Sequence, residues 1–199
     1  DSFTFQATDN SGRVNIATAT ITVNPVNDAP TAVDVSKTMD EDGGTIEVET
    51  NYNDIDGDTD ITFTLVDAPA NGTATVGIPG TYTPNENFNG TDTFTWKVDR
   101  GDGNFSNTAT FTVTVTAVND APTTSAVSAS TNEDTAKAIT LVGADIDGDN
   151  LTYSIVSNPS NGSLGNVSGT GVTYTPTANW NGTDTFTYKV NDGTVDSNT

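Results

Sequence analysis

Apolar and polar residues alternate along most of the chain, as in β-strands that pack one face on a core. Residues 93–98 read Thr-Phe-Thr-Trp-Lys-Val, and residues 110–115 read Thr-Phe-Thr-Val-Thr-Val. The alternating segments are separated by clusters of Gly, Asn, Asp and Pro, which form turns. No segment has the periodicity of an amphipathic helix. In the middle of the chain the pattern predicts seven strands, at residues 32–38, 45–52, 60–67, 73–77, 79–83, 92–98 and 107–116.

Several motifs recur about 92 residues apart. The linker-like segment Val26–Pro30 returns as Val118–Pro122, and the motif Asn89–Thr95 returns as Asn181–Thr187. Repeats of this length indicate tandem domains. They divide the chain into residues 1–30, which match the last strands of a repeat plus its linker; residues 31–122, a complete repeat; and residues 123–199, a second repeat lacking a counterpart of the last strand.

Seven short strands in about ninety residues are typical of an immunoglobulin-like sandwich. The predicted fold class is therefore all-β, with tandem immunoglobulin-like or cadherin-like seven-stranded Greek-key β-sandwiches in a linear array. Trp96 and Trp180 are expected to pack within or at the edge of these sandwiches rather than to stack on a sugar. The expected core rows are Phe94, Trp96 and Val98; Phe111, Val113 and Val115; and Phe186, Tyr188 and Val190.

The composition excludes several classes of function. The chain has 27 Asp and Glu against 6 Lys and Arg, which gives a net charge of −21. Such a surface repels nucleic acid and anionic lipid, and no apolar run approaches the ~20 residues of a membrane span, so we expect neither partner. Without His or Cys there is no Ser-His-Asp or Cys-His catalysis, zinc finger or disulfide. Because the carboxylates lie in repeated loops rather than one cleft, we expect no enzyme activity.

The acidic residues concentrate in loops that seven alternating strands bring to the ends of each sandwich. Asp-x-Asp-Gly-Asp occurs twice, at Asp54, Asp56 and Asp58 and again at Asp145, Asp147 and Asp149. Ca²⁺ takes six to eight oxygen ligands in flexible geometry, so converging carboxylates of this kind suit calcium better than magnesium. Asp-Gly loops can also be simple turns, but their recurrence favours metal. Because successive strands alternate in direction, the position of a loop in the strand order sets the end of the sandwich at which it lies. This places one group of residues together at the junction between residues 31–122 and residues 123–199: Glu41, Asp42, Asn119, Asp120, Asp145, Asp147, Asp149 and Asp192.

The loops do not form EF-hands. The position that needs a bidentate Glu is Leu65 in one copy and Val156 in the other. Arg100-Gly101-Asp102 spells an integrin-recognition tripeptide, but the next repeat does not keep it, and we give it no functional role.

These motifs together resemble a known family. Asn119–Pro122 resembles the interdomain linker of cadherins, and the loop beginning at Asp145 resembles their calcium loop. With Asn132-Glu133-Asp134 and the recurring Tyr-Thr-Pro and Asn-Gly-Thr-Asp motifs, the whole chain is similar to the tandem cadherin-like repeats of giant bacterial adhesins, of the VCBS and RTX-adhesin type. The resemblance implies Ca²⁺ at the junctions, and it adds to the candidate ligands Asn27, Asp28, Asp99, Asp102, Glu133 and Asp134.

From the resemblance we expect calcium-rigidified extender repeats of a large secreted or cell-surface adhesin, acting in cell adhesion or biofilm formation. The expected partners are calcium ions and neighbouring repeats, and the expected location is extracellular, with anchoring through other parts of the protein. One alternative is a carbohydrate- or protein-binding sandwich. Another is an extracellular filament subunit, in which residues 14–24 give a strand to the incomplete repeat of a neighbour in head-to-tail self-association.

Overall fold

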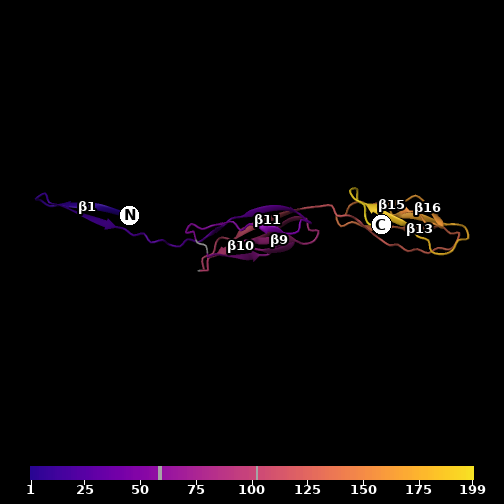
Figure 1. Ribbon diagram of the computed structural model, residues 1–199, viewed down its shortest axis with the longest axis horizontal. Helices are drawn as coiled ribbons and strands as arrows, with labels where there is room; N and C mark the ends of the chain where they lie inside the picture. Colours follow the sequence, from indigo (N-terminus) through magenta and orange to yellow (C-terminus); the bar gives the residue numbers. More distant parts are fainter. Residues whose placement is uncertain (58–59, 102) are drawn as a thin grey trace. The chain divides into compact units, whose positions relative to one another are not determined.

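The computed structural model describes residues 1–57, 60–101 and 103–199, and every regular element within them is a β-strand (Figure 1). The all-β prediction is therefore confirmed. The described residues form no helix that could cross a membrane. Two compact units are present, the first comprising residues 1–37, 45–83 and 91–113, and the second comprising residues 38–44, 84–90 and 114–199.

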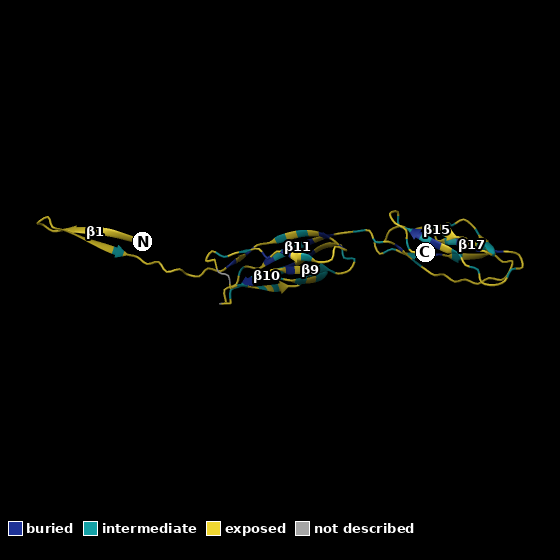
Figure 2. Ribbon diagram, viewed as in Figure 1, coloured by how far each residue is buried: buried dark blue, intermediate teal, exposed yellow. Residues whose placement is uncertain are grey.

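The first thirty residues contain an isolated hairpin. β1 (Ser2–Thr8) pairs antiparallel with β2 (Val14–Thr20), so that Ser2 lies opposite Thr20. The turn between them is stabilised by Asp9, whose Oδ1 accepts backbone N–H groups from Ser11 at 2.8 Å and Arg13 at 2.9 Å. Nearly every residue of the hairpin is exposed (Figure 2). A two-stranded sheet has no second layer, so its alternating apolar residues have no core to enter.

The middle repeat contains two sheets and a short strand pair. One sheet has the order β4-β11-β10-β7, the other has the order β5-β9-β8, and β3 pairs with β6. The strands are β3 (Thr31–Ala32), β4 (Val35–Asp40), β5 (Ile46–Val48), β6 (Tyr52–Asn53), β7 (Thr62–Asp67), β8 (Gly72–Thr75), β9 (Gly80–Pro84), β10 (Gly90–Asp99) and β11 (Ala109–Thr116).

All seven predicted segments of the middle repeat contain a strand, but the first two are each divided. Residues 32–38 change partner, from β6 to β11, and so form β3 and β4. Residues 45–52 likewise pair first with β9, as β5, and then with β3, as β6. A change of hydrogen-bonding partner interrupts the strand, and the alternation of side chains does not reveal it.

The core of the middle repeat follows the predicted rows. Trp96 and Phe111 are fully buried, and Phe94 is 1 % exposed. The rings of Phe94 and Phe111 stack with centroids 5.0 Å apart, and the rings of Tyr82 and Phe94 stack with centroids 6.0 Å apart. Such aromatic pairs add to the stabilisation from buried apolar area. Trp96 is thus a core residue, as predicted.

The final repeat forms smaller sheets. Their orders are β12-β14, β13-β17-β16 and β15-β18. Its core centres on Leu141, Val172 and Tyr188, with Phe186 packed against them but only half-buried. The strands are β12 (Thr123–Ser125), β13 (Lys137–Thr140), β14 (Val142–Ala144), β15 (Thr152–Ser157), β16 (Gly162–Leu164), β17 (Gly171–Pro176) and β18 (Thr187–Asn191).

Each repeat also has an aspartate that ties a loop to the sandwich. Asp92 is buried, and its carboxylate accepts hydrogen bonds from the Tyr82 hydroxyl at 3.0 Å and the Asn71 backbone at 2.9 Å. Asp184 makes the same contacts with Tyr174 at 3.1 Å and Asn161 at 2.9 Å. The recurring Tyr-Thr-Pro and Asn-Gly-Thr-Asp motifs are thus two halves of one structural contact.

Candidate metal centre

The loop that follows β14 brings three carboxylates together. Oxygen atoms of Asp145, Asp147 and Asp149 all lie within 4.8 Å of one another. The loop closes because Asp145 Oδ1 accepts the Asp149 N–H at 3.2 Å, and because Gly148 takes a φ of +81°, which glycine adopts without strain. The second oxygen, Asp145 Oδ2, is buried without a hydrogen-bond partner.

The linker preceding the final repeat contacts this loop. The Asp120 N–H donates to Asp147 Oδ2 at 2.7 Å, and Asn119 Nδ2 donates to Asp192 Oδ2 at 2.8 Å. The Asn119 hydrogen bond helps to hold the pKa of Asp192 below its ordinary value. Asp120 Oδ2, like Asp145 Oδ2, is buried without a hydrogen-bond partner. Because buried carboxylate oxygens are costly when unpaired, these two atoms call for a cation or proton.

Residues from an end of the middle repeat also lie near these carboxylates. They belong to the same compact unit as the linker and the Asp145 loop. Glu41 is 4 % exposed, and its Oε1 accepts the Val118 N–H at 2.6 Å. Its Oε2 accepts Asn89 Nδ2 at 3.3 Å.

The electrostatic effect of this arrangement falls on Asp120. Burial raises its pKa most, and the negative charges of Asp42, Asp147, Glu41 and Asp145 raise it further. These five carboxylates and the neighbouring Asp149 and Asp192 form the group that we call the second cluster.

A cavity of about 400 Å³ adjoins the second cluster. Among its lining residues are Asn89, Asn119, Asp147 and Asp149. Every charged or amide side chain on this surface offers oxygen and none is cationic. Carboxylate, amide and backbone oxygens are the ligands of hard divalent cations, and calcium tolerates their irregular placement better than magnesium does. The donor set therefore fits Ca²⁺.

The earlier copy of the Asp-x-Asp-Gly-Asp motif has a positively charged side chain beside it. The Asp28 N–H donates to Asp56 Oδ2 at 2.7 Å, in the same way as Asp120 and Asp147, and the Asp56 N–H donates to Asp54 Oδ1 at 2.9 Å. Here, however, Arg100 Nε lies 3.5 Å from Asp54 Oδ2, and both side chains are at least nine-tenths buried. An Arg100 guanidinium N–H also donates to the Asp28 carbonyl at 3.0 Å. Asp28, Asp54, Asp56 and Arg100 form the first cluster.

Arg100 is the site residue that sequence reasoning missed. It occupies the repeat position of Asp192, 92 residues later, so one cluster contains a cation where the other contains a further carboxylate. Aligning the two repeats position by position would have exposed the exchange. The integrin-like tripeptide drew attention to Arg100 for another reason.

The remaining predicted ligands lie elsewhere or serve a turn. Asp99 Oδ1 accepts the Gly101 N–H at 2.8 Å and so closes a turn. Asp134 Oδ1 accepts the Asn179 N–H at 2.9 Å, and Glu133 is exposed on a groove of the final repeat. Asn27 is exposed and directly precedes the first cluster. Asp58 and Asp102 lie outside the described residues.

Comparison with solved structures finds several chains of low sequence identity. The chain is 20 % identical to the EC1-4 segment of Drosophila N-cadherin, over 80 % of this chain and 44 % of that one, with a TM-score of 0.47. It is 21 % identical to an endo-fucoidan hydrolase of glycoside hydrolase family 107, over 98 % of this chain and 32 % of that one, with a TM-score of 0.35. A third similar structure is the surface layer protein SbsC, domains 4–9, at 14 % identity over 98 % of this chain and 34 % of that one, with a TM-score of 0.29.

The chain thus spans less than half of each of these structures. Comparison with curated protein sequences found no match. The non-catalytic bacterial Ig domain family matches residues 27–116 and 119–199, which is nearly the whole chain beyond the first hairpin. The protein therefore belongs to the bacterial Ig domain family, with two domains in tandem.

Proposed function

We propose that these tandem Ig domains bind calcium and serve as calcium-rigidified extender repeats of a large extracellular adhesin. The observation that carries the proposal is the pair of buried, unpartnered oxygens, Asp120 Oδ2 and Asp145 Oδ2, within a group of like charges. A divalent cation would supply both missing partners and neutralise the repulsion.

Calcium would act through the linker. Asp120 belongs to the linker, whereas Asp145, Asp147 and Asp149 belong to the following loop. Carboxylates from both segments on one ion would fix the linker against the loop, and Glu41 already holds the Val118 N–H of the same linker. Without the ion, the carboxylates repel one another, and the linker is free to adopt other conformations. The result of binding would be mechanical stiffness rather than chemistry.

The first cluster would depend less on calcium. Arg100 already provides a positive charge next to Asp54, so an ion would meet both competition and repulsion there. We therefore expect one site of higher affinity at the second cluster and a weaker site, or none, at the first.

An extracellular setting fits a site of this kind. Calcium sites of extracellular modules bind with dissociation constants of about 10⁻⁴ to 10⁻³ M, which leaves them empty in cytoplasm and filled outside the cell. The acidic surface and the tandem Ig domains suit a secreted or surface-attached protein. A giant adhesin of the VCBS or RTX type, acting in cell adhesion or biofilm formation, is the specific role that we propose.

Isothermal titration calorimetry tests the proposal. We expect calcium to bind the unmodified chain with one dominant site, and Asp145→Asn to weaken that site about 10-fold or more, since it removes a charged ligand. Glu86→Gln is the matched control, because it also removes one negative charge but from an exposed residue outside both clusters. Absence of calcium binding, or equal weakening by both substitutions, would refute the proposal.

A further inference from the structure

Asn is followed by Gly at four places in the chain, and in this dipeptide the asparagine side chain deamidates most easily. The pairs begin at Asn71, Asn89, Asn161 and Asn181. The backbone nitrogen of the glycine attacks the side-chain amide carbon of the asparagine. Glycine allows this because it has no side chain to hinder the approach and because its backbone rotates freely. The local structure then decides which pairs react.

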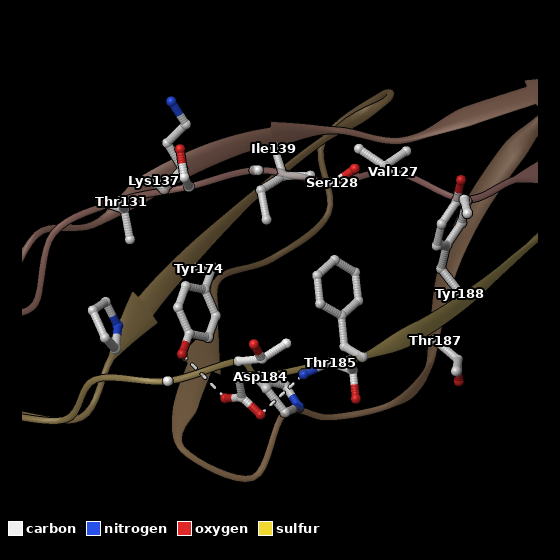
Figure 3. Close-up of a pocket in the computed structure, with 18 of the residues that line it drawn as sticks. Val127, Ser128, Thr131, Lys137, Ile139, Tyr174, Asp184, Thr185, Thr187 and Tyr188 are labelled. Carbon is white, nitrogen blue, oxygen red and sulfur yellow. Dashed lines mark hydrogen bonds between the residues drawn. The ribbon is translucent and has the colours of Figure 1, made fainter.

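Hydrogen bonds hold the pairs that begin at Asn71 and Asn161. The Asn71 N–H donates to the buried carboxylate of Asp92 at 2.9 Å. In the final repeat the Asn161 N–H donates to Asp184, also at 2.9 Å. Figure 3 shows the Tyr174 hydroxyl donating to the same Asp184 carboxylate, at 3.1 Å. Ring closure at either pair would have to break such contacts.

The pair formed by Asn89 and Gly90 is less constrained. Both residues are exposed. A Cβ on Gly90 would meet the Phe88 ring at 3.6 Å, which is an ordinary contact. A Cβ on Gly72, in the Asn71 pair, would lie only 2.8 Å from the buried Tyr82 ring. The backbone at Gly90 therefore has the room to turn toward the neighbouring amide that Gly72 lacks.

The Asn89 side chain lies beside the second cluster. Its Nδ2 donates to Glu41 Oε2 at 3.3 Å, which is long for such a hydrogen bond and restrains the amide weakly. Glu41 itself is 4 % exposed and is fixed by the Val118 N–H on its other oxygen. Asn89 also lines the cavity of about 400 Å³ together with Asp147 and Asp149. A carboxylate at position 89 would therefore face the same space as these acidic side chains.

We propose that Asn89 is a deamidation site, and that its product gives the second cluster a further carboxylate ligand for a divalent cation. The ligand role rests on the proposed calcium function. The modification itself does not, because it depends only on the geometry of Asn89 and Gly90.

The reaction has two steps and consumes only water. In the first, the Gly90 nitrogen bonds to Asn89 Cγ and closes a succinimide ring, and Nδ2 leaves as ammonia with the proton from the Gly90 N–H. In the second, water opens the ring. Cleavage of the bond between Cγ and nitrogen gives aspartate, and cleavage of the bond between the main-chain carbonyl carbon and nitrogen gives isoaspartate. Either product has one more negative charge than Asn89.

The product changes the second cluster in two ways. Glu41 Oε2 loses the N–H donor of Asn89 and faces a like charge, which destabilises the folded chain while no cation is bound. With a cation in the cavity, both carboxylates offer oxygen to it. The number of charged ligands is one of the features that set calcium affinity. The calcium affinity of the second cluster therefore increases as the chain ages.

Mass spectrometry of proteolytic peptides tests the modification. The unmodified chain is incubated at neutral pH in the presence of a chelator, and the mass increase at each Asn-Gly pair is followed with time. Because ring closure at Asn71 or Asn161 must first break a hydrogen bond, we expect Asn89 to deamidate at least about 10-fold faster than either. Equal rates at the three positions, or an Asn89 that stays intact, would overturn the inference.

The variant Asn89→Asp reproduces the aspartyl product without incubation. Titration calorimetry should show calcium binding about 10-fold tighter than in the unmodified chain, since one more charged ligand is present. Asn181→Asp is the matched control, because it adds the same charge to the same motif at an exposed position outside both clusters. Unchanged affinity in Asn89→Asp, or an equal gain in both variants, would overturn the ligand role.

Thermal unfolding distinguishes a ligand from a simple folding defect. In the presence of a chelator, Asn89→Asp should melt at a lower temperature than the unmodified chain, and calcium should reduce or reverse that difference. A loss of stability that calcium leaves unchanged would overturn the ligand role. Failure of the proposed function has a different signature: neither chain would bind calcium, while the peptides would still show deamidation at Asn89.

Discussion

The middle and final repeats share their motifs but differ in what surrounds them. Residues 90–94 begin β10, whereas residues 182–186, which have the same sequence, form no strand. The first acidic cluster contains Arg100, whereas the second has Asp192 at the matching position. A motif therefore specifies which groups converge, while its neighbours decide whether the backbone is paired and whether the charge is balanced.

The substitution Arg100→Asp gives the first cluster the carboxylate that the second cluster has at Asp192. In the presence of a chelator, Arg100→Asp should destabilise the protein by about 3 to 5 kcal/mol, because it breaks a buried ion pair and leaves Asp54 unpaired. We expect added calcium to bind the altered cluster, as we propose for the second cluster, and so to restore part of that stability. Chemical unfolding in chelator and in calcium measures both effects. A variant whose calcium response matches that of the unmodified chain would show that the two clusters differ for another reason.

The opposite change weakens the second cluster. Asp192→Asn keeps an oxygen for the turn that Asp192 closes with Thr194 and Val195 but removes the charge. Calcium affinity should fall about 10- to 100-fold, as when a group that supports a metal site is changed. Titration calorimetry reads this directly, and Asp196→Asn, on the exposed pair with Lys189, is the control. An unchanged calcium affinity would show that Asp192 does not contribute to the calcium site.

Each repeat should lose stability from a methyl group on the glycine beside its tyrosine. A Cβ on Gly72 would lie 2.6 Å from the Thr83 carbonyl and 2.8 Å from the buried Tyr82 ring. A Cβ on Gly162 would lie 2.3 Å from the Tyr174 ring, whose hydroxyl donates to Asp184 at 3.1 Å. Gly72→Ala and Gly162→Ala should therefore each cost about 1 to 3 kcal/mol. Thermal unfolding measures both losses, and a neutral substitution at either position would show that the tyrosine beside it can move aside.

The smallest effect concerns acid stability in the final repeat. Burial alone would raise the pKa of Asp184, but hydrogen bonds from Asn161, Ser160, Tyr174 and Thr185 outweigh it and hold the pKa below its ordinary value. A lowered folded pKa contributes stability above the unfolded pKa, and this stability is lost as the pH falls through the folded value. The melting temperature measured in the presence of a chelator should thus fall as the pH is lowered below about 4. Asp184→Asn should flatten that decline, and an unchanged profile would contradict the assignment.

The sequence predicted the fold well because its main signals do not depend on which strands pair. The alternation at residues 93–98 and 110–115 identified the core rows, and the recurrence at 92 residues identified the repeats. Strand division within residues 32–38 and 45–52 was missed, since it depends on pairing partners far along the chain.

The candidate site was predicted less completely. The Asp145 loop and the linker residue Asp120 were placed together by the alternating direction of the strands, and the structure has them in contact. The ion pair of Arg100 was not predicted, because an alignment of the repeats shows that Arg100 replaces Asp192 but not that its guanidinium lies beside Asp54. Asp134 was assigned from resemblance alone, and in the structure it accepts a backbone N–H from Asn179.

Thermal unfolding of the unmodified chain across a calcium titration tests the central claim most directly. With a dissociation constant of about 10⁻⁴ M, calcium at about 10 mM should stabilise the protein by about 2.7 kcal/mol, and magnesium should do much less. Small-angle scattering on the same samples should show a narrower distribution of shapes when calcium is bound. Equal melting temperatures and equal scattering in chelator, calcium and magnesium would contradict the account and leave the Asp-Gly loops as turns.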